Sequence, residues 1–163
     1  YQALLAVGVI KVVVISLAGY FFDTFGRKAL LLTSYLGMFV SLLLLGTSQT
    51  SAVHAPVLGF LAVIVYVSFF SIGAGPGAWL VSSEVFSNDI RAKGMSLAVF
   101  SNRVVSLMNA SAFLSMLNTM GPMGCFGFYA CLCVAAAAFI HTRVPETRGK
   151  TLEEMFTIFQ HVD

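Results

Sequence analysis

The sequence predicts an all-α chain of polytopic membrane helices, on the evidence of its composition and the placement of its charges. Of its 163 residues, 58% are hydrophobic and only 10% are charged, whereas charged residues make up about 25% of a soluble domain. No Asp, Glu, Lys or Arg occurs between Lys28 and Glu84, or between Arg103 and Arg143. Apolar stretches of this length predict membrane spans, because about 20 helical residues cross about 30 Å of hydrocarbon. A soluble bundle would need charged helix faces, which these stretches lack.

Polar or turn-forming segments divide the chain into five predicted spans. The separating segments are residues 23–28, 47–55, 87–94 and 118–123, the last of which contains the turn signal Gly121-Pro122. The predicted spans cover residues 1–22, 29–47, 56–82, 95–118 and 122–142. Residues 143–163 follow as a charged tail, in which Thr151 and Glu154 fit the capping box of a short amphipathic helix.

The basic residues predict an orientation, since cytoplasmic loops carry an excess of Lys and Arg. Seven of them fall on one side of the predicted membrane: Arg27, Lys28, Arg91, Lys93, Arg143, Arg148 and Lys150. The opposite loops contain no Lys or Arg. We therefore expect a multi-pass integral membrane protein with this side and the C-terminus in the cytoplasm. Plasma and vacuolar membranes both fit.

Two cations are predicted to lie deep in the bilayer. Lys11 is twelve residues from Asp23 and Arg103 is nine residues from Gly94, or about 18 Å and about 13–14 Å of helix. Half of the hydrocarbon core is about 15 Å. A charge at that depth costs roughly 2.5–3.5 kcal/mol on insertion scales. We therefore expect both side chains to face a polar cavity, with snorkelling toward the interface as the alternative.

The third and fourth spans carry further features of a polar cavity. Three glycines and Pro76 lie within residues 73–77, which predicts an interrupted helix at Gly73 and Pro76, as in transporter binding sites. Trp79 follows as an apolar plate with one N–H donor. Asn102, Ser106 and Asn109 share one face of the fourth span. The alternative is polar packing between helices, which we prefer for Asn109.

Other classes of function find little support. The net charge of +2 and the absence of basic runs interleaved with aromatics give no nucleic-acid signal. No cofactor, metal site or enzyme is expected. The odd cysteine count in one apolar stretch argues for packing cysteines, and the histidines are scattered. These residues are Cys125, Cys131, Cys133, His54, His141 and His161.

Three motifs stand at the ends of the predicted spans. Residues 23–28 read DTFGRK, and residues 144–154 read VPETRGKTLEE. Between them lie Gly75-Pro76-x-x-Trp79, Ser83-Glu84-Val85-Phe86 and Arg91-x-x-Gly94. In order and spacing they resemble the D-x-x-G-R-R/K loop, the G-P-x-x-W…E-x-F…R-x-x-G block and the P-E-T-K-G-R-T-x-E-E tail of the sugar porter family of the major facilitator superfamily.

The resemblance leans toward proton-coupled polyol and monosaccharide transporters. Glucose facilitators usually carry Asn where Lys11 stands and Trp where Arg103 stands, with prolines in place of Ala74 and Ala78. Ser87 departs from the common E-x-F-P. The resemblance implies that residues 1–142 are helices eight to twelve of a twelve-helix transporter. We therefore expect one further helix and an N-terminal half beyond this sequence.

The resemblance also implies roles for single residues. Those expected to line the site for a sugar or polyol are Trp79, Asn102, Lys11, Arg103 and Gly75. Those expected to form a cytoplasmic gate, locked by ion pairs in the outward-facing state, are Asp23, Gly26, Arg27, Lys28, Glu84, Arg91 and Glu146. For the charged residues of this gate, simple loop topology is the alternative. The implied function is transport of a monosaccharide or polyol by alternating access, with or without protons; the alternative is a non-transporting relative such as a sugar sensor.

Overall fold

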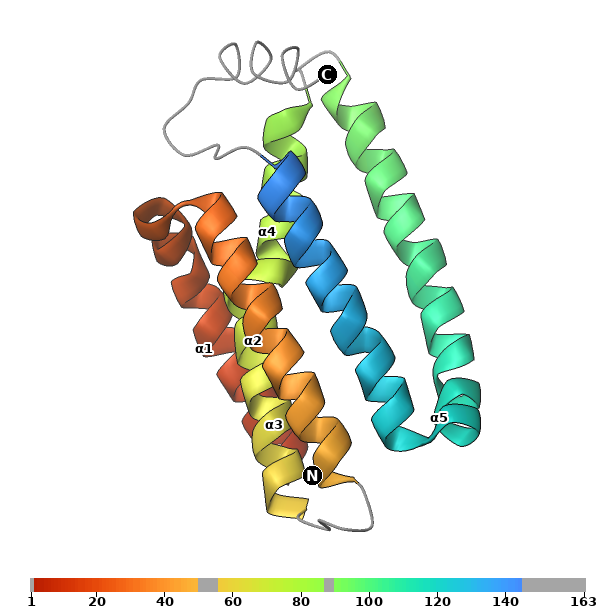
Figure 1. The fold of residues 1–163 in the computed structure, drawn as a ribbon. Helices are drawn as coiled ribbons and strands as arrows, with labels where there is room; N and C mark the ends of the chain where they lie inside the picture. Colours follow the sequence, from red (N-terminus) through yellow and green to blue (C-terminus); the bar gives the residue numbers. More distant parts are fainter. Residues whose placement is uncertain (1, 50–55, 87–89, 145–163) are drawn as a thin grey trace.

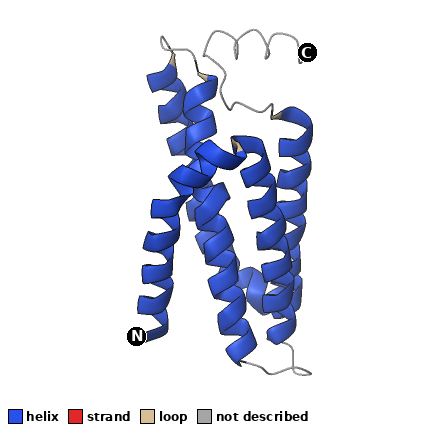
Figure 2. Cartoon of the chain, turned by 90° about the vertical axis from the view of Figure 1, so that its left-hand side faces the viewer, coloured by secondary structure: helices blue, strands red, loops and turns tan. Residues whose placement is uncertain are grey.

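The computed structural model describes residues 2–49, 56–86 and 90–144, and within these ranges it contains only helices and their connections (Figures 1 and 2). The elements in chain order are α1 Gln2–Phe25, α2 Arg27–Ser48, α3 Pro56–Phe69, the π-helical η1 Phe70–Ala74, α4 Gly75–Val85 and α5 Arg91–Arg143. The all-α fold class predicted from the sequence is therefore confirmed. The predicted tail helix lies outside the described residues.

The long helix α5 is two antiparallel arms. As one straight helix, its 53 residues would extend about 80 Å, far more than the hydrocarbon core. The chain instead reverses at Gly121, whose φ of 71° and ψ of 171° are non-helical, and Pro122 opens the second arm. Figure 1 shows the two arms running back along each other. The elements α3, η1 and α4 continue into one another and form one rod, which we call the third rod. The described residues thus make five rods, as the five predicted spans require.

The outer surface of the bundle is apolar, as contact with lipid requires. Large hydrophobic side chains are widely exposed, among them Val57 at 71% and Leu107 at 70%. Among the described residues, three helical stretches are long and apolar enough to cross a membrane: Arg27–Ser48, Pro56–Ser83 and Arg91–Arg143. The shorter apolar stretch Val7–Phe22 precedes them. By length and composition, these stretches fit an integral membrane protein.

The helices pack through small side chains around α2. Met38 and Leu42 of α2 form a buried cluster with Ala74 of η1 and with Ala130 and Cys133 of the second arm of α5. Small residues at such contacts let the backbones approach closely, which is how helices associate in lipid. The three cysteines of this arm are free; Cys125 and Cys133 are buried, as expected for packing residues, whereas Cys131 is exposed.

The predicted helix break at Gly73 and Pro76 takes a different form. The backbone does not unwind; it widens into a π-helical turn over Phe70–Ala74 and continues as α4. The Gly75 N–H bonds to the carbonyl of Phe70, five residues back. Pro76 has no N–H, and its ring clashes with a tight preceding turn. The wider turn accommodates the ring without exposing the backbone, so the interruption is a change of helix type.

Glycines let the third rod lie close against α2. A Cβ on Gly73 would come within 2.6 Å of Ser34 Cβ and 2.7 Å of the Leu30 carbonyl oxygen. A Cβ on Gly37 of α2 would come within 2.3 Å of the Phe69 ring. The π-helical turn is therefore packed directly against the backbone and short side chains of α2.

Candidate functional site

A cavity of about 690 Å³ lies among α1, α2, the third rod and the first arm of α5. Small-molecule sites usually occupy about 300–1,000 Å³. We call it the polar cavity, because cationic, amide, indole and hydroxyl groups interrupt its apolar lining. Its lining residues are Lys11, Tyr35, Met38, Phe70, Ala74, Gly75, Ala78, Trp79, Ser82, Ala98, Asn102, Arg103 and Ser106.

The structure brings all the predicted substrate residues to this one cavity. They are Lys11, Gly75, Trp79, Asn102 and Arg103. The two cations come from α1 and α5, far apart in the sequence, and they share a cavity as the depth argument expects. This placement agrees with cations facing a polar space inside a membrane protein. That these residues bind a substrate stays a prediction.

The arrangement suits a neutral, polyhydroxylated molecule. The indole of Trp79 is 36% exposed, which leaves ring surface for the C–H face of a sugar. The Asn102 amide can both donate and accept, while Lys11 and Arg103 only donate. No carboxylate lies among the described lining residues. Hydroxyl oxygens of a sugar are acceptors that these donors can satisfy.

Sequence reasoning did not single out three polar lining residues as site residues. Ser106 shares a helix face with Asn102, which was visible in the sequence. Ser82 follows Trp79 by three residues and so lies near the same face of α4. Tyr35 comes from α2, and no periodicity in the sequence marks it. It enters the cavity through tertiary packing alone.

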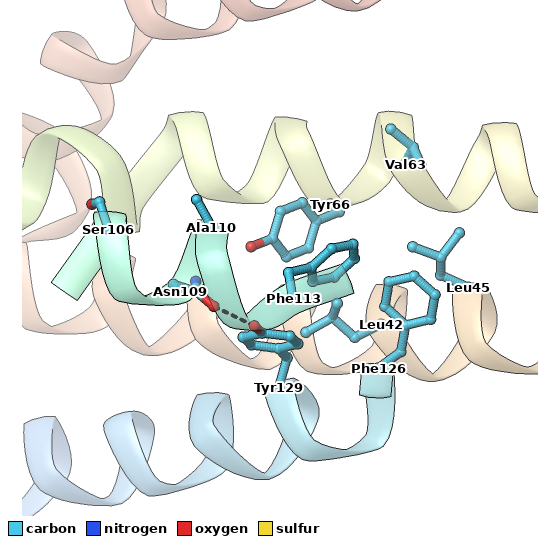
Figure 3. Close-up of a pocket in the computed structure, with 10 residues that line it drawn as sticks. All are labelled: Leu42, Leu45, Val63, Tyr66, Ser106, Asn109, Ala110, Phe113, Phe126 and Tyr129. Atoms are coloured by element: carbon cyan, nitrogen blue, oxygen red, sulfur yellow. Dashed lines mark hydrogen bonds between the residues drawn. The ribbon is translucent and has the colours of Figure 1, made fainter. Parts of the chain in front are cut away.

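A second cavity of about 480 Å³ lies beside the first and shares Ser106 with it. Figure 3 shows rings from three rods around it, with Tyr66 on α3, Phe113 on the first arm of α5 and Tyr129 on the second. The Tyr129 hydroxyl donates to Asn109 Oδ1 and joins the two arms. The interpretation of Asn109 as a polar packing residue is thereby confirmed.

The predicted gate residues gather at one end of the bundle, which we call the basic end. The α1–α2 turn, the end of α4 and both outer ends of α5 point toward it, opposite the reversal of α5 (Figure 1). The backbones of Asp23 and Glu84 lie in the last turns of α1 and α4. Glu146 lies outside the described residues.

The motifs at the basic end have a visible structural basis. Gly26 connects α1 to α2 with a φ of 88°, a left-handed backbone that favours glycine. The Arg91 Nε donates to the Phe86 carbonyl over 3.3 Å, and the Phe86 ring covers Gly94, where a Cβ would come within 2.8 Å. Lys28 Nζ donates to the His141 carbonyl over 2.8 Å. These contacts between motif residues hold neighbouring helix ends together at the basic end.

Comparison with known proteins agrees with this geometry. The family described as "Sugar (and other) transporter" matches residues 1–159. Polyol transporter 5 of Arabidopsis thaliana is 41% identical over 164 residues, which cover 96% of this chain and 30% of the relative. The chain thus spans about a third of the length of this relative.

Solved structures give the same result. The inward open xylose transporter XylE from E. coli is 34% identical with a TM-score of 0.84, over 94% of this chain and 34% of that one. The proton:xylose symporter XylE bound to 6-bromo-6-deoxy-D-glucose is 31% identical with a TM-score of 0.81, over 97% and 34%. The chain belongs to the sugar porter family of the major facilitator superfamily.

Proposed function

We propose that the protein containing this chain carries a monosaccharide or polyol across a membrane by alternating access, coupled to protons. The polar cavity carries the proposal, because it unites Trp79, Asn102 and two intramembrane cations from separate helices. The similarity to a polyol transporter supports the substrate class, and the similarity to a proton:xylose symporter supports the coupling. The described lining residues include no acid, so we place the proton-binding group elsewhere in the whole protein.

In this proposal each lining group has a separate task. Trp79 stacks on the C–H face of the substrate, and Asn102 exchanges hydrogen bonds with neighbouring hydroxyls. Lys11 and Arg103 donate to hydroxyl oxygens from opposite walls. Gly75 lines the cavity without a side chain, which leaves the substrate close to the π-helical turn. Residues 1–142 serve as the last five of twelve spans, and residues 143–163 as a cytoplasmic tail.

Uptake of radiolabelled polyols, pentoses and hexoses by the full-length protein in transporter-deficient cells tests the function. Trp79→Ala should abolish saturable uptake at unchanged surface expression, because the stacking plate is lost. Phe139→Ala is the matched control, since that aromatic ring is 62% exposed on the second arm of α5 and lines neither cavity. A well-expressed parent that takes up none of these solutes contradicts the carrier and leaves the sugar sensor.

We further propose that the basic end is the cytoplasmic gate. Asp23, Arg27, Glu84 and Arg91 lie on helix ends that converge there, and ion pairs among them would hold one state of a two-state element. Charge reversal by Arg27→Glu should trap the carrier open to the cytoplasm. Reactivity of an introduced thiol at position 82 toward an impermeant reagent, applied from each side, measures this. Lys93→Glu reverses an exposed charge on the first turn of α5 and serves as the control; equal access in both variants and the parent would contradict the gate.

A further inference from the structure

The hydroxyl of Ser34 reaches from α2 into the backbone of the third rod. Ser34 is 1% exposed. Its Oγ donates to the Phe69 carbonyl over 2.6 Å and accepts from the Ala74 N–H over 2.9 Å. Phe69 and Ala74 are five residues apart, which is the spacing of a π-helical hydrogen bond. A single side chain from a neighbouring helix therefore bonds to the carbonyl just before the wide turn and to the last N–H within it.

The packing around this contact is tight, and the other acceptor beside the hydroxyl, Met38 Sδ at 3.9 Å, is a weak one. Gly73 brings the turn so close that a Cβ there would lie 2.6 Å from Ser34 Cβ. Within the part of the chain that the structure describes, the buried Ser71 hydroxyl of the same turn has no hydrogen-bond partner. The Ser34 contact thus favours the π-helical form and offsets the cost of the unpaired Ser71 hydroxyl in the same turn.

The helix type of this turn determines where α4 points. An α-helical bond from Ala74 would go to Phe70 in place of Phe69, with one residue fewer in the turn. One residue corresponds to about 100° of rotation about the helix axis. Conversion would therefore turn Trp79 and Ser82 relative to α3, although both line the polar cavity in the π-helical form.

We propose that Ser34 is a positioning residue whose hydroxyl holds Phe70–Ala74 in the π-helical form and so directs Trp79 into the polar cavity. Loss of this hydroxyl would raise the fraction of molecules in which the turn is α-helical. The link to transport rests on the proposed function. The pair of hydrogen bonds that join the Ser34 hydroxyl to Phe69 and Ala74, which we call the Ser34 clip, does not depend on that function. Ser34 contacts no substrate and acts only through the backbone of the neighbouring rod.

The test compares Ser34→Ala with Ser41→Ala in the full-length protein that carries Ser82→Cys. Ser41 is a matched control, because it is equally buried on α2 but donates to Gly37 of its own helix over 2.7 Å. The readout is the rate at which an impermeant thiol reagent modifies Cys at position 82. The rate measured in protein that retains Ser82 is subtracted, because it reports modification of the other cysteines. Removing one buried hydrogen-bonding group shifts such an equilibrium about five- to thirtyfold. We expect the thiol rate at position 82 to change by up to that factor in Ser34→Ala and by less than about twofold in Ser41→Ala.

Two further variants separate the hydroxyl from general packing. Ser34→Thr keeps the hydroxyl but adds a methyl group at a buried site, so it should retain more of the parental rate than Ser34→Ala. Gly73→Ala pushes a methyl group against Ser34 and should shift the rate in the same direction as Ser34→Ala. If Ser34→Ala does not reach the membrane, this pair supplies the same comparison. Equal rates in the Ser34→Ala and Ser41→Ala proteins, or a Thr variant that behaves like Ala, overturn the proposal.

Uptake kinetics give the second readout. A smaller population of the binding-competent form raises the apparent KM in proportion, so Ser34→Ala should raise KM by the factor seen in the thiol rate, with less effect on kcat. If the parent protein shows no uptake but Ser34→Ala still alters the thiol rate at position 82, the result contradicts the proposed function and supports the positioning role of Ser34. If Ser34→Ala takes up substrate normally with an unchanged KM and thiol rate, the result contradicts the positioning role of Ser34 and supports the proposed transport function.

Discussion

The contact between Gly37 and the Phe69 ring gives a sharp prediction for stability. Gly37→Ala would place a Cβ 2.3 Å from Phe69 Cγ, 2.4 Å from Cδ1 and 2.5 Å from Cδ2. Carbon atoms in contact lie about 3.5–4.0 Å apart, so the ring must retreat by about 1 Å. Because the clash involves Cγ at the base of the ring, rotation of the ring about χ2 alone does not relieve it.

The magnitude follows from two opposing contributions. Replacing glycine by alanine inside a helix stabilises it by roughly 0.5–1 kcal/mol, whereas overpacking of this kind costs about 1–3 kcal/mol. We expect a net loss of about 1–2 kcal/mol in the free energy of unfolding. Gly19→Ala is the control, since a Cβ at that position of α1 meets nothing within 4 Å. That variant should be neutral or slightly more stable than the parent.

Thermal unfolding of the purified full-length protein in detergent measures both variants. Gly37→Ala should lower the Tm, and Phe69→Leu in the same protein should recover part of the loss, because the smaller side chain frees space beside α2. The double-mutant cycle should show coupling, as expected for residues in direct contact. A Gly37→Ala protein that is as stable as Gly19→Ala would refute the close approach of α2 and the third rod.

Two further predictions concern the connections between helices. Gly26→Ala should destabilise the protein by about 1–3 kcal/mol, because the φ of 88° and ψ of 153° at this position lie in a region that only glycine adopts readily; thermal unfolding checks this, and an unchanged Tm would contradict the turn geometry. Tyr129→Phe removes the hydrogen bond to Asn109 and should cost about 0.6 kcal/mol, the average for such contacts in a membrane protein. In an Asn109→Ala background the same change should have no effect, and a full additional loss would show that the two side chains do not interact.

The sequence predicted the helical spans and the composition of the cavity because both depend on local rules. Uncharged stretches of span length define helices in a bilayer, and the distance of Lys11 and Arg103 from the span ends placed them at a common depth. Helical spacing then put Asn102 and Ser106 on one face. Each of these inferences needs only the rise and the period of a helix, which do not depend on the neighbouring rods.

The π-helical turn could not be predicted in the same way. Glycines and Pro76 signalled an interruption, but its form depends on Ser34, which lies 35 residues before Phe69 in the sequence. Tyr35 reaches the cavity through the same packing of α2 against the third rod. Contacts between rods decide how a weakened helix is repaired, and no period in a single sequence reports them.

The reversal of α5 at Gly121 also bears on how the protein enters the membrane during synthesis. No Asp, Glu, Lys or Arg occurs between Arg103 and Arg143, so carrying this turn across the bilayer transfers no charged carboxylate, ammonium or guanidinium group. The Phe113 ring contacts the rings of Phe126 and Tyr129 with centroids 6.4 Å and 6.2 Å apart. Because these rings join the arms beside the turn, the two arms can enter the membrane together as one helical hairpin.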